Sequence, residues 1–220
     1  MPAIFTDRRQ GFSLAPYESF NLAHHVGDDV EAVNKNRALL VSMVGPTQFM
    51  NQVHGDVFVR VDGTTEVDPI CDALITTTKG ISLAVMVADC IPLLLQSQSV
   101  AAAVHVGRKG VHNGIALKVV AEMRRLGAVD IHATLGASIC GRCYEVSQAI
   151  QDEVCASNPQ AFSLTREQTP ALDLPKALIA RLVEQGVTYE ASTVCTLEDP
   201  NHFSYRRHNI TGRSAGVVWL

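Results

Sequence analysis

The sequence predicts a single mixed α/β domain in which strands alternate with helices. Nearly continuous apolar runs at residues 81–87 and 100–104 are typical of strands covered on both faces. Stretches with helical periodicity alternate with these runs and are bounded by helix start and stop signals. A chain of 220 residues is long enough for one well-buried domain, and no repeat or linker divides it. We therefore expect one domain over residues 1–220.

The first half of the chain contains one expected helix followed by strands. Residues 1–50 look irregular apart from a helix over 30–44, which Asp28 or Asp29 can cap and Gly45-Pro46 ends. The β-branched and aromatic run at 57–61 predicts a strand. The remaining expected strands of this half are the apolar runs at 81–87, 93–95 and 100–104.

The second half alternates helices and strands. Apolar residues spaced by three or four predict a helix over 113–126, and Gly127 ends it. Another helix is expected at 174–184, with Asp173 as its cap and Pro175 in its first turn. The other expected elements are a strand at 131–139, a helix at 147–156 and a closing strand at 215–220.

Composition and charge exclude several classes of function. A net charge of −4 provides no basic stripe, so we expect no nucleic-acid partner. No apolar run approaches the roughly 20 residues of a membrane span, and the N-terminus lacks the apolar core of a signal peptide. We therefore expect a cytoplasmic protein with no membrane partner. A monomer or homodimer is expected, although composition does not decide between them. Its six cysteines are expected to be reduced, with Cys71, Cys155 and Cys195 as buried small residues.

Two histidines and one cysteine form the best candidate site. His54, Cys90 and His105 each close a short apolar run beside a Gly or Pro, where strands break into loops and side chains can converge. A thiolate and two imidazoles suit Zn²⁺, with Cu²⁺ as the alternative, and three ligands leave a coordination position for water or substrate. Either histidine taken alone is more often an ordinary core or turn residue.

The same atoms also permit a different chemistry. Cys90 can be a thiolate nucleophile with His105 as its general base, as in papain-like enzymes. Both readings need a thiol of low pKa near an imidazole, so the sequence leaves them open.

The only C-x-x-C motif of the chain is Cys140-Gly-Arg-Cys143. Such a motif between a strand and a helix invites a redox interpretation, but one motif is a weak signal. A structural zinc site would need a second ligand pair, and the sequence contains no other C-x-x-C. We expect these cysteines to have a packing role.

Several segments, in order over nearly the whole chain, resemble one known family. They are Asn21-Leu-Ala-His-His-Val-Gly-Asp-Asp29, Gln52-Val-His-Gly55, Cys71-Asp-Ala-Leu-Ile-Thr76, Leu83-Ala-Val-Met-Val-Ala-Asp-Cys-Ile-Pro92, Ala103-Val-His-Val-Gly107, Tyr144-Glu-Val146, Cys195-Thr196, Ser204-Tyr-Arg-Arg207 and Thr211-Gly-Arg213. On these motifs the chain resembles the YfiH/YlmD-like proteins, a laccase-like (multicopper polyphenol oxidase) family with purine nucleoside phosphorylase and peptidoglycan editing factor members.

The resemblance implies an activity and a ligand set. The metal-binding, catalytic trio of the family falls on His54, Cys90 and His105. The resemblance implies a single α/β domain with mixed β-sheets flanked by helices. Members are implied to be cytoplasmic enzymes that cleave adenosine, inosine and methylthioadenosine with phosphate and deaminate adenosine with water. The older assignment is copper-dependent oxidation of phenols, and a third alternative is a non-catalytic cell-wall editing factor. A multicopper oxidase needs several ligand sets, and only one convincing trio is apparent.

Further residues are expected around this trio. Asp89 or Asp72 could shuttle a proton in deamination, and Arg206 or Arg108 could bind phosphate. Gln52 and Asp72 are expected at the substrate. The sequence departs from the family where Gly107-Arg108-Lys109-Gly110 replaces the usual Gly-Trp-Arg-Gly, and also at Gln10-Gly11-Phe12-Ser13 in place of Gly-Gly-Val-Ser. The first departure changes a stacking aromatic residue for a cation beside the site.

Overall fold

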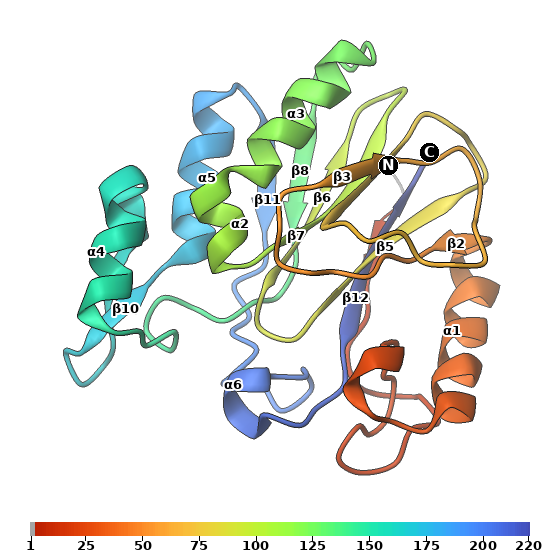
Figure 1. Cartoon of the computed structure of the whole chain (residues 1–220), viewed down its shortest axis with the longest axis horizontal. Helices are drawn as coiled ribbons and strands as arrows, with labels where there is room; N and C mark the ends of the chain where they lie inside the picture. The colour runs from red at the N-terminus through yellow and green to blue at the C-terminus, as the bar shows by residue number, and fades with distance from the viewer. Residues whose placement is uncertain (1–2) are drawn as a thin grey trace.

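Two β-sheets stack face to face, and helices cover their outer faces (Figure 1). The computed structural model describes residues 3–220. In this part of the chain a small sheet has the strand order β1-β12-β5-β2 and a large sheet the order β11-β8-β6-β7-β4-β3. The small sheet comprises β1 (Ala3–Phe5), β12 (Ser214–Trp219), β5 (Ser82–Val87) and β2 (Thr47–Gln48). The large sheet comprises β11 (Thr188–Ala191), β8 (His132–Leu135), β6 (Ile91–Gln96), β7 (Ala101–Val106), β4 (Ala73–Thr76) and β3 (Phe58–Arg60).

Both sheets are mixed, which confirms the expected fold class. In the small sheet β12 is antiparallel to β1 and β5, whereas β2 is parallel to β5. In the large sheet the outer pairs β11–β8 and β3–β4 are parallel and the central pairs are antiparallel. A separate hairpin pairs β9 (Phe162–Leu164) with β10 (Pro170–Leu172).

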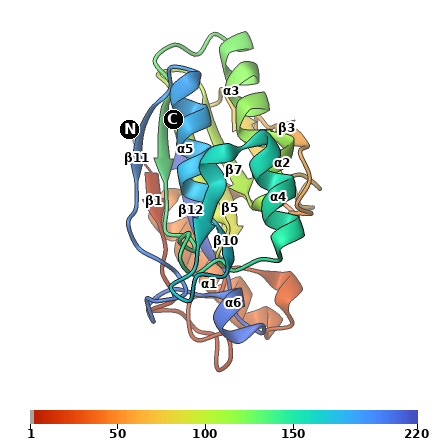
Figure 2. The ribbon, with the colours of Figure 1, turned by 90° about the vertical axis from the view of Figure 1, so that its left-hand side faces the viewer.

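Helices lie at both ends of this stack. Figures 1 and 2 show α2, α3, α4 and α5 grouped together, away from α1. None of the helices within residues 3–220 is long and apolar enough to cross a membrane. The helices are α1 (Val30–Val44), α2 (Arg108–Asn113), α3 (Ile115–Arg125), α4 (Gln148–Ser157), α5 (Leu174–Glu184) and α6 (Tyr205–His208), with 3₁₀ turns η1 (His24–Val26) and η2 (Pro159–Ala161).

The alternation of side chains along the strands explains the order of the layers. Ala102 and Val104 of β7 pack in a core with residues of α3 and α5, whereas Ala101 and Ala103 pack in a second core with β5 and β12. Successive residues of a strand point to opposite faces, so the large sheet lies between the helices and the small sheet. On β5, Ala84 and Met86 face a third core that contains Leu40 of α1. The layers therefore run helices, large sheet, small sheet, α1.

Local signals predicted the long helices well. Residues 30–44 form α1, with Asp29 as the cap that accepts from the Glu31 N–H, and 174–184 form α5 behind Asp173. The expected helix over 113–126 is wrong at its start, because Gly114 adopts a left-handed φ of 73° and separates α2 from α3. The expected strand over 131–139 ends at Leu135.

Candidate active site and metal centre

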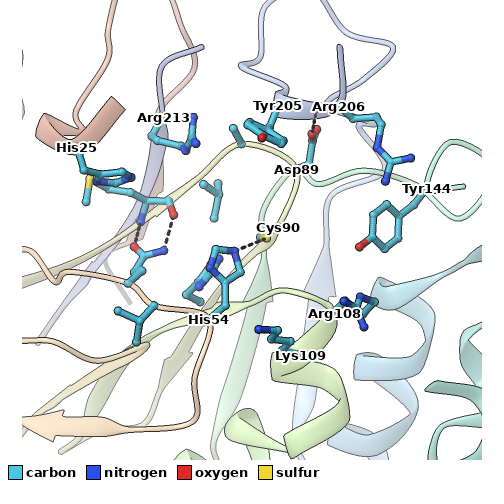
Figure 3. A pocket seen from close by; sticks show the side chains of 16 residues that line it. His25, His54, Asp89, Cys90, Arg108, Lys109, Tyr144, Tyr205, Arg206 and Arg213 are labelled. Carbon is cyan, nitrogen blue, oxygen red and sulfur yellow. Dashed lines mark hydrogen bonds between the residues drawn. The ribbon is translucent and has the colours of Figure 1, made fainter. Parts of the chain in front are cut away.

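A corner between the two sheets brings Cys90 and His105 together. The chain leaves β5 of the small sheet at Val87, turns through Asp89 and Cys90, and enters β6 of the large sheet. Strand β7 runs antiparallel to β6 with His105 opposite Pro92, so the His105 side chain arrives beside Cys90. His54 comes from the loop between β2 and β3 and completes the group (Figure 3).

The three side chains form a compact donor group. One ligand atom from each of His54, Cys90 and His105 lies within 4.8 Å of the others. The Cys90 Sγ is 4.0 Å from Nε2 of His54. The two imidazole rings meet edge to face, with centroids 4.7 Å apart and an interplanar angle of 82°. His105 is 3% exposed, whereas His54 is exposed, so the group is closed on one side and open on the other.

Asp72 holds this group from behind. Its carboxylate is fully buried; Oδ1 lies 2.8 Å from Nδ1 of His105 and accepts from the His54 N–H at 2.9 Å. Oδ2 accepts from the Gly55 N–H at 2.6 Å. Burial alone would raise the pKa of Asp72, but the His105 hydrogen bond and the backbone N–H groups lower it overall. A carboxylate on the outer nitrogen of a histidine fixes the ring and leaves the other nitrogen for a ligand.

Cys90 and His105 shift each other's pKa in opposite directions. Burial opposes the charge on both groups, but the His105 charge lowers the pKa of Cys90 to about 6. The Cys90 thiolate and Asp72 in turn raise the pKa of His105 to about 9. At neutral pH the sulfur is therefore a thiolate, which is the form that binds metal or attacks an electrophile.

The backbone around the donor group is constrained. His54 and Asp89 have left-handed φ angles of 59° and 90°, which non-glycine residues adopt at a cost of about 1–3 kcal/mol. Gly107 leaves room for the group, because a Cβ built there would lie 3.0 Å from Cys90 Sγ and 3.4 Å from Cδ2 of His54. Strained backbone conformations and close packing of this kind are concentrated at sites where the fold must fix the orientation of functional side chains.

The donor group fits a single transition-metal ion. Bond lengths of about 2.3 Å to sulfur and about 2.0 Å to nitrogen place two tetrahedral ligand atoms ~3.5 Å apart. The 4.0 Å between Cys90 Sγ and His54 Nε2 is close to that separation. One thiolate with two imidazoles suits Zn²⁺ or copper, and three protein ligands leave a position that faces the open side.

The open side is a pocket of about 550 Å³, within the range of small-molecule sites. Figure 3 shows Arg108 and Lys109 on one side of the Cys90 thiol and Arg206 and Arg213 on the other. The lining residues are His25, Gln52, Val53, His54, Met86, Val87, Ala88, Asp89, Cys90, His105, Arg108, Lys109, Tyr144, Tyr205, Arg206 and Arg213.

The structure brings most of the expected site residues to this pocket. Gln52, Asp89, Arg108 and Arg206 line it. The Gln52 amide is hydrogen-bonded to both backbone groups of Met86, at 2.7 and 2.8 Å. Asp89 accepts from Thr196 Oγ1 and from the Arg206 N–H, each at 2.6 Å.

Asp72 is placed differently from the other expected residues. It is fully buried behind the histidines and is not among the residues that line the pocket. Its position suits a group that aims the ligands rather than one that contacts substrate.

Sequence reasoning assigned no site role to several pocket residues, namely His25, Tyr144, Tyr205 and Arg213. Burial, followed by the charges of Arg213 and Arg37, lowers the pKa of His25, so its ring is neutral at neutral pH. Tyr144 and Arg213 lie in segments that match the family, and position within those motifs was the available signal.

The structure also assembles a second donor group. Sγ of Cys140, Cys143 and Cys195 and a carboxylate oxygen of Glu198 lie within 4.8 Å of one another. The expectation that Cys195 is an ordinary buried cysteine is therefore incomplete. The C-x-x-C motif thus lies beside a second potential ligand pair, which the segment Cys195-Thr-Leu-Glu198 supplies.

Comparison with known proteins places the chain in a family. Residues 2–220 match the family described as multi-copper polyphenol oxidoreductase laccase. The chain belongs to this laccase family. Its fold agrees with solved structures: a Neisseria meningitidis protein has a TM-score of 0.90 and 34% identity and covers 99% of this chain and 93% of its own. The Bacillus licheniformis protein YfiH also has a TM-score of 0.90, at 28% identity over 99% of this chain and 92% of its own.

The names of curated relatives of this chain describe a different activity from the name of the family. A purine nucleoside phosphorylase of Streptomyces coelicolor is 45% identical over 98% of this chain and 94% of its own length. A purine nucleoside phosphorylase of Corynebacterium glutamicum is 42% identical over 99% of this chain and 93% of its own. The expected resemblance is thus confirmed, and the family name and the relatives' names point to different reactions.

Proposed function

We propose that the protein cleaves purine nucleosides with phosphate, taking adenosine, inosine and methylthioadenosine, and that it deaminates adenosine with water. The observation that carries this proposal is the convergence of Arg108, Lys109, Arg206 and Arg213 on one pocket of an acidic chain. Cations around a pocket attract and orient phosphate. The names of the curated relatives point to the same reaction.

The phosphate side of the pocket is held in position by hydrogen bonds. Arg206 donates from NH1 to the Glu145 carbonyl at 2.8 Å, and its guanidinium lies 5.0 Å from the centroid of the Tyr144 ring. A guanidinium fixed by a carbonyl and an aromatic face keeps its remaining N–H groups for an anion. Arg108 lines the facing side of the pocket, and its charge partly offsets the burial that raises the pKa of Tyr144.

The nucleoside side offers polar and aromatic groups. A neutral His25 provides one hydrogen-bond donor and one acceptor, which suits the edge of a purine. The Tyr205 ring lines the same part of the pocket, beside Arg213. Aromatic rings that line a pocket supply faces on which a flat base can stack.

The two proposed reactions differ in the bonds that form and break. In phosphorolysis a phosphate oxygen bonds to the anomeric carbon of the sugar while the bond to the purine nitrogen breaks, and the base leaves with the electron pair and gains a proton. In deamination, water replaces the exocyclic amine and ammonia leaves. His54, Cys90 and His105 would hold a metal ion, which would supply Lewis-acid chemistry at the pocket. Because both oxygens of Asp89 already accept hydrogen bonds, we assign Asp89 to positioning Arg206.

A multicopper oxidase is the competing function. Within residues 3–220 the donor groups that could hold a metal are the trio of His54, Cys90 and His105 and the group around Cys140. The second group contains no imidazole, and its thiolates are typical of zinc sites. This inventory favours phosphorolysis over multicopper electron transfer, with Zn²⁺ at the trio and Cu²⁺ as the alternative ion there.

The test measures both chemistries on the same protein, purified without added metal. Adenosine and inosine are incubated with and without phosphate, and free base and ribose 1-phosphate are quantified by chromatography. We expect base release that depends on phosphate, a Michaelis constant for phosphate that rises in Arg206→Ala, and zinc in the protein by elemental analysis. Oxidation of a phenol with several coppers per chain, and no base release, would contradict the proposal.

A further inference from the structure

We propose that Cys140, Cys143, Cys195 and Glu198 form a second metal site, a structural zinc site separate from the pocket. The donor atoms of the four side chains lie within 4.8 Å of one another. Three thiolates and one carboxylate complete the four positions of a tetrahedral ion, which is the pattern of a closed structural site. The pocket group, in contrast, provides three donors and an open position.

Two turns of matching backbone geometry present these donors. In the first, the N–H groups of Cys143 and Tyr144 both donate to the Cys140 carbonyl at 3.0 Å. In the second, the N–H groups of Glu198 and Asp199 donate to the Cys195 carbonyl at 3.1 and 2.9 Å. Each turn thus places its first and fourth side chains together, as paired-ligand turns around zinc do.

The two turns face each other across a short backbone link. Ser138 and Cys195 form a parallel bridge, and the Thr196 N–H donates to the Ser138 carbonyl at 3.1 Å. The Cys140 N–H donates to Sγ of Cys195 at 3.3 Å. The segments that follow β8 and β11 run side by side at this point (Figure 1). The sulfur atoms are therefore brought together by a folded framework from distant parts of the sequence.

The surroundings supply partial charge compensation. Arg166 forms an ion pair with Glu198, and its pKa is raised first by that carboxylate and then by the nearby thiols. Arg207 donates from NH1 to the carbonyls of Thr196, Leu197 and Asp199 at 2.9, 3.0 and 3.1 Å, which fixes the second turn. A divalent ion held here would balance the charges of the three thiolates and of the Glu198 carboxylate.

The site would connect two walls of the pocket. Cys143 directly precedes Tyr144, and Cys195 directly precedes Thr196, which donates to Asp89 at 2.6 Å. Asp89 in turn accepts from the backbone of Arg206. An ion that binds both turns would therefore fix the positions of Tyr144 and Arg206 relative to each other.

The experiment counts zinc in a protein whose pocket ligand is removed. Cys90→Ser protein is purified without chelator or added metal, and its zinc is measured by mass spectrometry. We expect about one zinc per chain, because the pocket has lost its thiolate ligand and only the second site remains to bind zinc. Cys90→Ser/Cys143→Ser should contain none, and the matched control Cys90→Ser/Cys155→Ser should keep its zinc. Absence of zinc in Cys90→Ser after anaerobic reconstitution with Zn²⁺, or full occupancy in Cys90→Ser/Cys143→Ser, would overturn the proposal.

Two further measurements keep the test decisive if Cys143→Ser folds poorly. Glu198→Gln changes an exposed side chain, and in the Cys90→Ser background it should weaken zinc affinity about 10-fold or more against a competing chelator, with unchanged circular dichroism. Thiol titration of the denatured wild-type protein should find every cysteine reduced, whereas a shortfall of two thiols would reveal a disulfide in this group and overturn the zinc assignment. Because the pocket ion is absent from these variants, failure here is distinct from failure of the proposed phosphorolysis.

Discussion

The group around Cys90 and the group around Cys143 both contain cysteine, but the pKa of the cysteine differs between them. Beside His54 and His105, Cys90 has a pKa lowered to about 6 despite burial. Cys143 lies among other thiols, and burial together with Cys140 and Cys195 raises its pKa. The same side chain thus has a lowered pKa in one group and a raised pKa in the other, because a histidine lies beside it in the first and other thiols lie beside it in the second.

The difference indicates two roles for sulfur. A thiolate that is already charged beside an open pocket is ready to hold an ion whose remaining position faces substrate. Thiols that ionise only when a cation arrives suit a closed site whose ion stabilises the fold. The following experiments are designed to break or sharpen this division, beginning with the largest expected effect.

Replacing Cys90 should separate the two groups most clearly. Cys90→Ser should lower phosphorolysis by at least about 100-fold and remove the pocket metal, because a hydroxyl is a poor zinc ligand. Cys140→Ala/Cys143→Ala should keep most of the turnover number, raise the Michaelis constant for phosphate through Tyr144 and Arg206, and lower the urea midpoint of unfolding. Equal losses of activity in both proteins, or full pocket occupancy in Cys90→Ser, would show that the division is wrong.

Asp72→Asn tests how far the pocket group depends on its buried support. One carboxylate oxygen becomes an NH₂ donor facing the N–H groups of His54 and Gly55, and the charge opposite His105 disappears. We expect zinc affinity and activity to fall about 10- to 100-fold, the usual cost of losing an outer carboxylate. Zinc binding measured by competition, with circular dichroism as the control for folding, checks this. Unaltered affinity would leave Asp72 with a packing role.

The pH dependence of alkylation compares the thiols directly. In metal-stripped protein, iodoacetamide should modify Cys90 at a rate that rises through about pH 6 and levels off above pH 7, since its pKa is lowered to about 6. Cys143, whose pKa is raised, should react about 10-fold more slowly at pH 7 and should still be accelerating at pH 9. Peptide mass spectrometry assigns each site, and Cys90→Ser is the control. Parallel profiles for both cysteines would contradict the lowered pKa of Cys90 beside His105.

The smallest expected effect concerns the rim of the pocket. Arg108→Trp removes a cation and adds a flat ring, so the Michaelis constant for phosphate should rise and that for adenosine should fall, each about 3-fold. The salt dependence of the phosphate constant should weaken as well. Lys109→Gln is the matched control for charge alone. Constants that do not change in Arg108→Trp would mean that this departure from the family pattern does not reach the substrate.

The elements that could be predicted from the sequence are those determined by residues close together in the chain. Helices α1 and α5 follow from their aspartate caps, and the buried strands β5 and β7 follow from their apolar runs. Cys90 and His105 were identifiable because each ends such a run. These features depend on neighbours within a few residues, which is the range that a single sequence can resolve.

The features that escaped prediction depend on tertiary contacts. Cys195 and Glu198 join Cys140 and Cys143 only because the turns after β8 and β11 are bridged, and no local spacing reveals that. The burial of Asp72 behind the histidines likewise depends on where the loop of His54 packs. The left-handed conformation of Gly114, which divides α2 from α3, depends on a choice of φ that glycine leaves open.

The placement of His105 on β7 restricts how this strand can change. Its odd-numbered neighbours Ala101 and Ala103 face the small sheet, whereas Ala102 and Val104 face the helices. Insertion or deletion of a single residue before His105 would turn the imidazole into the apolar layer under α3 and bring a valine to Cys90. A change of two residues would restore the face but break the pairing of His105 with Pro92. Sequence drift in β7 is therefore confined to substitutions, and any length variation must be absorbed in the turn that precedes the strand.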